Sequence, residues 1–160
     1  MKFTQHFNNI ISKAFKMLGF LIRTCRNFSK METVMLLYKT LVRSQLEYAS
    51  VIWSPASKTY ADAIEKVQRK FTRYIFRKFC YPYQFYEDRL LTLNLCSLHV
   101  RRKEMDMKFL YKMMNGIVST TCIADMIVRY NQKNIRNMNI FGLRRYNTKQ
   151  CKNSLVTRMM

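Results

Sequence analysis

The sequence predicts an all-α protein, and three observations lead to this prediction. Only 3 Gly and 2 Pro occur among the 160 residues, so residues that break helices are scarce. Apolar residues recur at steps of three and four as far as about Asn115, which is the spacing of amphipathic helices. Hydrophobic residues make up 49% of the chain, which is enough for a packed core and more than a disordered basic chain carries.

Three helices are expected in the first part of the chain. They cover about residues 8–27, 31–53 and 57–79. The second has the widest apolar arc, which includes Leu41, Tyr48 and Ile52, so we expect it to be the central and most buried helix. Ser57 follows Pro55 and is a suitable N-cap for the third helix, because its hydroxyl can accept a free amide of the first turn.

Shorter helical patterns follow at about residues 87–93 and 97–115, and Gly116 is a plausible C-terminal stop. Residues 122–130 are compatible with one more short helix, and the chain after them is polar, basic and rich in Asn. We therefore expect three segments. They are a helical bundle at 1–80, additional helices packed on it at 81–116, and a basic, poorly ordered C-terminal segment at 117–160.

The charge balance indicates a polyanionic partner. The chain carries 29 Lys and Arg against 9 Asp and Glu, for a net charge of +20, and a folded surface with that charge repels itself. Nucleic acid is the first candidate and an anionic membrane surface is the second. No apolar run is long enough to span a bilayer and no secretory signal is recognisable, so we expect a nuclear or cytoplasmic protein.

The third helix carries the clearest candidate site. Five cations share one side of it at steps of three and four residues: Lys66, Arg69, Lys70, Arg73 and Arg77. Glu65 is the only acid between Asp62 and Glu87, whereas a solvated helix face usually mixes charges of both signs. We therefore predict that this face contacts phosphates, and the alternative is a charged face that only meets solvent.

Other basic and aromatic clusters are weaker candidates. Arg101 and Arg102 lie close to Glu104 and Asp106, so phosphate contact and solvation stay equal alternatives there. A further basic cluster surrounds Arg144–Arg145. Four aromatic side chains just after the third helix either stack on bases or plug the core: Tyr81, Tyr83, Phe85 and Tyr86.

No catalytic, metal or cofactor site is predicted. The five cysteines form no CxxC pair, and the two histidines have no ligand-like neighbours. The few acids form no paired-carboxylate motif of the kind that holds two metal ions, and a glycine-rich phosphate loop is lacking. We therefore expect no cofactor and assign no catalytic residue.

Several segments resemble non-LTR (LINE-type, jockey-like) retrotransposon reverse transcriptases. LVRSQLEYASVIW, from Leu41 to Trp53, resembles a signature that follows the polymerase active site of that family. Three further segments resemble its neighbouring blocks in the same order: KAFKMLGFLIR (Lys13–Arg23), IEKVQRKFTRYI (Ile64–Ile75) and LNLCSL (Leu93–Leu98).

The resemblance implies a thumb-like three-helix bundle and the segment after it, which grip the template-primer duplex. It also implies that the catalytic palm precedes residue 1, so this chain would be a fragment of an RNA-directed DNA polymerase that is inactive alone. The expected partners are RNA or DNA in a template-primer, bound without sequence preference, and the palm domain. Alternative functions are a helical protein-interaction module or a peripheral binder of anionic membranes.

Overall fold

The computed structural model describes residues 3–55 and 57–118, together with the backbone of residues 128–129 and 141–142. Residues 3–118 contain helices and their connections, so the fold class is all-α, as predicted. The remaining described residues form a two-residue antiparallel pair, β1 (Val128–Arg129) with β2 (Phe141–Gly142). The short helix predicted at about residues 122–130 is therefore wrong at residues 128–129, which form a strand. Most of the predicted basic tail lies outside the described residues.

The chain divides into two compact units, residues 1–102 and 103–160, and the division falls inside α7 (Leu98–Met114). The sequence suggested divisions after residues 80 and 116 instead. Gly116 ends α7 as predicted, with a left-handed φ of 68°. Its amide donates to the Met113 carbonyl at 3.2 Å and the Ile117 amide donates to the Lys112 carbonyl at 3.0 Å, which is the Schellman pattern.

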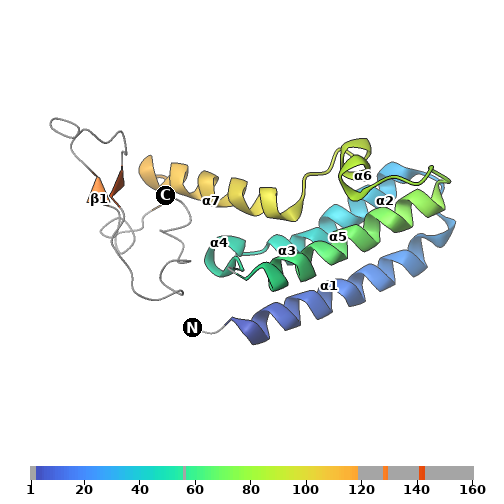
Figure 1. Cartoon of the computed structure of the whole chain (residues 1–160), viewed down its shortest axis with the longest axis horizontal. Coiled ribbons are helices and arrows are strands. Elements are labelled where there is room, and N and C mark those ends of the chain that lie inside the picture. Colours follow the sequence, from blue (N-terminus) through green and yellow to red (C-terminus); the bar gives the residue numbers. More distant parts are fainter. Residues whose placement is uncertain (1–2, 56, 119–127, 130–140, 143–160) are drawn as a thin grey trace. The chain divides into compact units, whose positions relative to one another are not determined.

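Three helical segments of the first unit lie side by side as a bundle (Figure 1). They are α1 (Thr4–Thr24), a second segment built from α2 (Met31–Leu37), η2 (Tyr38–Arg43) and α3 (Ser44–Glu47), and α5 (Lys58–Lys78). The 3₁₀ turn η1 (Cys25–Asn27) extends α1, α4 (Ser50–Trp53) precedes α5, and α6 (Tyr86–Thr92) packs on α5. The three-helix bundle predicted for the first 80 residues is thus present.

The core of this unit lies between the three segments. Its most deeply buried apolar side chains are Leu18 and Leu21 from α1, Val34, Tyr38, Val42 and Leu46 from the second segment, and Ile64, Val67, Phe71 and Ile75 from α5. The second segment is therefore not buried more than its neighbours, because α5 contributes a full apolar stripe and also buries Glu65, Gln68 and Thr72.

The second segment is not the continuous α-helix that the sequence predicted for residues 31–53. Its middle, η2, is a π-helix, and the helix is broken at Ala49, which has a left-handed φ of 52°. The buried residues Val34, Tyr38, Val42 and Leu46 follow one another at steps of four. Such a series drifts by about 40° per step on an α-helix, and the wider π turn offsets that drift.

This geometry corrects the predicted core of the second segment. Leu41, Tyr48 and Ile52 were expected to face inward, because they follow α-helical spacing. All three are exposed, and Tyr48 is 81% exposed. Val42 and Leu46 are buried, and the π turn directs them into the core.

The ends of α5 are set by its neighbours. Ser57 occupies the N-cap position, as predicted, but its hydroxyl makes no capping hydrogen bond. At the other end, the Lys78 ammonium donates to the backbone carbonyls of Cys25 and Arg26, which ties α5 to the end of α1. Cys80 then takes a left-handed φ of 55°, and the chain turns into the connection to α6. None of the helices in the described ranges has the length and apolarity needed to cross a membrane.

Candidate nucleic-acid interface

The five cations predicted on the third helix lie together on the exposed side of α5. Lys66, Arg69, Lys70, Arg73 and Arg77 are all solvent-exposed, and they lie opposite the buried stripe of Val67, Phe71 and Ile75. They extend over about 16 Å of helix axis, at 1.5 Å per residue. None of the five forms an ion pair with a carboxylate within the described part of the chain. Their charge is therefore available to a polyanion.

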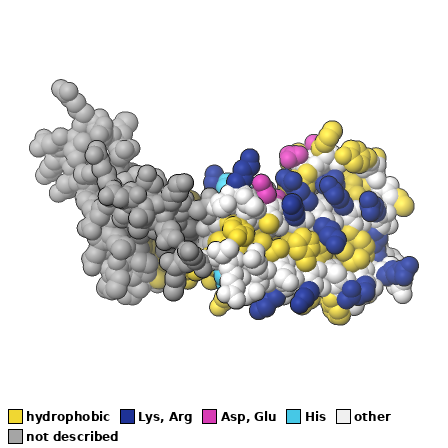
Figure 2. Space-filling model, turned by 60° about the horizontal axis from the view of Figure 1, so that its bottom comes forward, with side chains coloured by type: hydrophobic (Ala, Val, Ile, Leu, Met, Phe, Trp, Pro, Cys, Tyr) yellow, Lys and Arg dark blue, Asp and Glu magenta, His cyan; other side chains and the backbone are white. Residues whose placement is uncertain are grey.

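Two of these cations rest on aromatic rings. The Arg69 guanidinium lies over the Tyr86 ring, 4.9 Å from its centroid, and the Lys70 ammonium lies over the Phe15 ring at 5.6 Å. Such contacts position a cation without neutralising it, because the ring carries no net charge. Figure 2 shows Lys and Arg covering far more of the visible helical surface than Asp and Glu.

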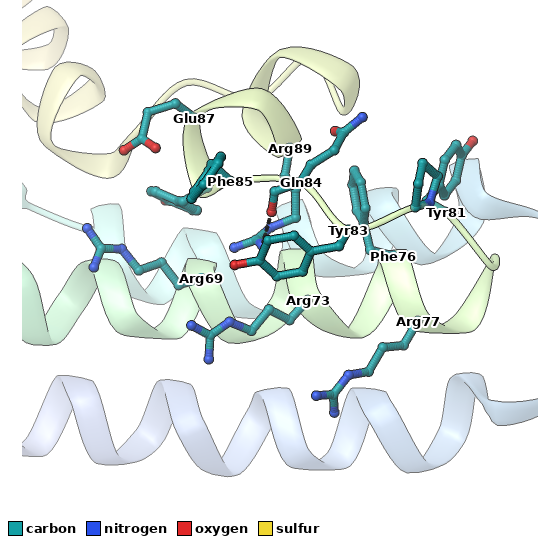
Figure 3. A pocket seen from close by; sticks show the side chains of 12 residues that line it. Arg69, Arg73, Phe76, Arg77, Tyr81, Tyr83, Gln84, Phe85, Glu87 and Arg89 are labelled. Atoms are coloured by element: carbon teal, nitrogen blue, oxygen red, sulfur yellow. Dashed lines mark hydrogen bonds between the residues drawn. The ribbon is translucent and has the colours of Figure 1, made fainter.

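The basic face of α5 separates two hollows. The first, of about 600 Å³, lies between α5 and the segment from Tyr81 to Glu87 (Figure 3). The second, of about 720 Å³, lies between α5 and α1, where Phe15 and Ile22 line it. Arg69, Arg73 and Arg77 line both hollows, so these three arginines form a ridge between them. Glu87 is the one carboxylate among the residues that line the first hollow.

The aromatic residues after α5 divide into two groups. Tyr83 is 86% exposed and Phe85 is 71% exposed, so neither plugs the core. Their rings are 6.0 Å apart and nearly perpendicular, at 71°. Tyr81 packs on Phe76 with ring centroids 5.1 Å apart, and Tyr86 is largely enclosed. Of the two predicted alternatives, packing into the core therefore applies to Tyr86, whereas Tyr83 and Phe85 stay exposed.

A polar network under the basic face explains where Glu65 points. Its carboxylate is 7% exposed and accepts hydrogen bonds from the Tyr86 hydroxyl and from the Leu98 amide, the latter at 3.1 Å. The acid closest to the five cations in sequence is thus directed inward, toward the start of α7. It leaves the exposed face of α5 purely cationic between Lys66 and Arg77.

Gln68 continues the network from the same helix. Its side-chain oxygen accepts a hydrogen bond from the Tyr38 hydroxyl at 3.0 Å, and its side-chain nitrogen donates to the Tyr86 hydroxyl at 3.2 Å and to the Cys96 carbonyl at 2.9 Å. Burial raises the pKa of both tyrosines above the ordinary value, and for Tyr86 the hydrogen bond to Glu65 raises the pKa further. Both hydroxyls therefore stay protonated at neutral pH and act as donors.

The other two predicted nucleic-acid ligands do not join the α5 face. Arg101 is engaged by Glu47 of α3, with its Nη2 donating to Oε2 at 3.0 Å. Arg102 is buried, with 3% of its surface exposed. A run of cations in sequence usually indicates a solvated helix face, but here Arg101 is partly buried and paired with Glu47, and Arg102 is enclosed.

Arg89 is a structural residue of this region that the sequence did not single out. It is buried, donates from Nη1 to the Gln84 carbonyl at 2.8 Å and from Nε to Thr72 Oγ1 at 3.3 Å, and lies over the Tyr86 ring. The sequence does hold a signal for this role. Arg89 shares a helical face with Tyr86, Leu90 and Leu93, so its position belongs to the buried side of α6.

A third hollow lies on a different part of the first unit. It measures about 740 Å³ and is mostly apolar, with Ile10, Phe20, Tyr48 and Trp53 in its lining and Lys13 and Lys16 among its few charged groups. It contains no row of cations comparable to that on α5. Within the described residues, no group of three or more His, Cys, Asp or Glu side chains is placed to hold a metal ion.

Comparisons with known proteins add no assignment. Neither a protein-family model, nor a curated protein, nor a solved structure matches the chain. The resemblance to retrotransposon reverse transcriptases therefore stays a prediction that rests on its sequence segments alone.

Proposed function

We propose that the helical unit binds nucleic acid without sequence preference, through the basic face of α5. The observation that carries this proposal is the row of five exposed cations without carboxylate partners in the described residues. Phosphate groups repeat regularly along any nucleic acid, so a row of cations along one helix fits them whatever the bases are.

The resembling segments give this binding a more specific role. The segment from Leu41 to Trp53 spans the end of η2, α3 and α4, and the segment from Ile64 to Ile75 lies within the basic helix α5. In the proposed role, the bundle acts as the thumb of an RNA-directed DNA polymerase and holds a template-primer duplex. The chemistry would then belong to a palm domain, which is the proposed protein partner.

The test is the salt dependence of binding by the full chain. Four or five phosphate contacts predict a log–log slope of about −4 for a duplex. Replacing both Arg73 and Arg77 with Ala should weaken binding to all duplex sequences alike and reduce the magnitude of the slope by about two. Unchanged affinity and slope in this double variant would assign the basic face to solvent and refute the proposal.

Lys13 and Lys16 offer a matched control. The double replacement Lys13→Ala and Lys16→Ala removes the same charge from α1, beside the apolar hollow rather than on the α5 face. It should change the slope much less than the α5 double variant does. An equal effect of the two variants would indicate a diffuse response to net charge instead of a defined interface.

A vesicle-binding assay with the same protein distinguishes the membrane alternative. Vesicles that contain phosphatidylserine present a dense anionic surface, to which a basic helical protein can also bind. Strong vesicle binding together with no measurable nucleic-acid binding would replace the present proposal with a peripheral membrane function.

A further inference from the structure

We propose that the first hollow takes a single-stranded stretch of nucleic acid, with its bases stacked on Tyr83 and Phe85 and its phosphates on Arg69, Arg73 and Arg77. This inference rests on the proposed function and specifies the ligand of the same site. The observation behind it is that exposed aromatic rings and a row of arginines line one cavity (Figure 3).

The two rings are placed to receive bases. Tyr83 and Phe85 are large side chains that stay mostly in water, and their nearly perpendicular arrangement leaves at least one face of each ring uncovered by the other. Aromatic faces next to a cationic groove are the combination that binds single strands without sequence preference, because every base has a flat face for stacking.

The segment that carries the rings is anchored on both sides of Phe85. Arg89 donates a hydrogen bond to the Gln84 carbonyl, and Tyr86 is held by Glu65 and Gln68. Arg69 and Arg89 in turn lie over the Tyr86 ring. A segment that is already ordered loses little conformational entropy when it binds a ligand. The backbone that carries the rings is therefore held in place beside the arginine ridge.

Unpaired bases fit these rings better than paired ones. In a duplex the base faces are covered by the neighbouring base pairs, so the protein meets phosphates and base edges but no uncovered base face. A single strand presents phosphates on one side and uncovered base faces on the other. The arginine ridge and the rings of Tyr83 and Phe85 match those two sides within one hollow.

The experiment compares three ligands with the full chain. They are a blunt duplex, the same duplex with a short single-stranded overhang, and the same overhang built from abasic nucleotides, which keeps the phosphates and removes the bases. The overhang with bases should raise affinity by about tenfold over the blunt duplex, and the abasic overhang should not. Measuring the affinity for a DNA overhang and for an RNA overhang of the same sequence shows whether the site distinguishes the two sugars.

Two variants link the effect to the rings. Replacing Tyr83 and Phe85 together with Ala should abolish the gain from the overhang, while blunt-duplex affinity and its salt slope stay unchanged. The exchange of Tyr83→Phe with Phe85→Tyr keeps both flat rings and should keep the gain. Circular dichroism should show that both variants retain the helical fold.

The outcomes separate this inference from the function on which it rests. Salt-dependent binding of the blunt duplex without a gain from the overhang would overturn the stacking platform and leave the basic interface standing. An equal gain from the abasic overhang would also overturn it, since phosphates alone would explain the result. Absence of binding to all three ligands would refute the proposed function itself.

Discussion

Tyr38 and Phe71 lie ring against ring at the centre of the three-helix bundle, with 3.8 Å between ring centroids and 6° between ring planes. Both side chains are fully buried. The Tyr38 hydroxyl also donates a hydrogen bond to the Gln68 side chain, so this one residue joins the second segment to α5 by an apolar and a polar contact.

Replacing Tyr38 with Phe tests the polar half of this contact. The variant keeps the ring stack but leaves the buried Gln68 oxygen without its donor, so we expect the free energy of unfolding at pH 7 to fall by about 1–3 kcal/mol. Urea denaturation measures this change. The exposed Tyr48 provides the control, because Tyr48→Phe removes the same hydroxyl from a solvated site and should be nearly neutral. Equal effects of the two variants would contradict the buried contact.

The same residue predicts how stability depends on alkaline pH. Burial raises the pKa of Tyr38 above its unfolded value of about 10. The unfolded chain therefore loses this proton first, and the contribution of Tyr38 is complete below about pH 10 and declines as the pH rises above that value. Denaturation between neutral and alkaline pH should show a shallower decline in Tyr38→Phe than in the wild type, and parallel declines would contradict the raised pKa.

Leu41 and Leu46 offer a direct test of the second segment. Leu46 is buried in the core, so Leu46→Ala should cost about 2–5 kcal/mol of unfolding free energy. Leu41 is exposed, so Leu41→Ala should cost at most about 1 kcal/mol, although the sequence had placed Leu41 in the core. Chemical denaturation measures the unfolding free energy of both variants. A larger loss for Leu41→Ala than for Leu46→Ala would contradict the π turn.

Glu65→Gln tests the network beneath the basic face. The substitution keeps the shape but removes the charge that accepts hydrogen bonds from Tyr86 and from the Leu98 amide at the start of α7. We expect a loss of about 1–3 kcal/mol in unfolding free energy. Glu87→Gln is the control, because Glu87 is exposed. A neutral Glu65→Gln variant would show that the buried carboxylate contributes little.

Arg101 is expected to stabilise the fold and to leave nucleic-acid binding unaffected. A double-mutant cycle with Arg101→Ala and Glu47→Ala should give a coupling energy of about 0.5–3 kcal/mol, because the two side chains are in contact. The salt slope for duplex binding should not change in Arg101→Ala. A slope reduced as much as by an α5 arginine would instead place Arg101 on the phosphate path.

The sequence predicted α5, α6 and the basic face well, because these depend on local periodicity. The start and end of α5 and α6 lie within one residue of the predicted ranges, and the five cations opposite Phe71 are exposed as expected. The inward direction of Glu65 was not predictable in this way, since its partners Tyr86 and Leu98 come from other elements. Arg101 and Arg102 were misplaced for the same reason, because tertiary packing decides whether a cation next to a helix start is exposed.

The π turn at Tyr38–Arg43 acts as a one-residue insertion in the second segment. Loss of one residue there would let the turn relax to an α-helix and would nearly preserve the direction of everything after it, because five α-helical residues turn through about 500° and the six π-helical residues turn through nearly the same angle. Leu46 would stay in the core and Glu47 would keep its side toward Arg101. A single-residue deletion in this turn should therefore be tolerated better than one in the middle of α5, where it would rotate the rest of the helix by about 100° and expose part of its buried stripe.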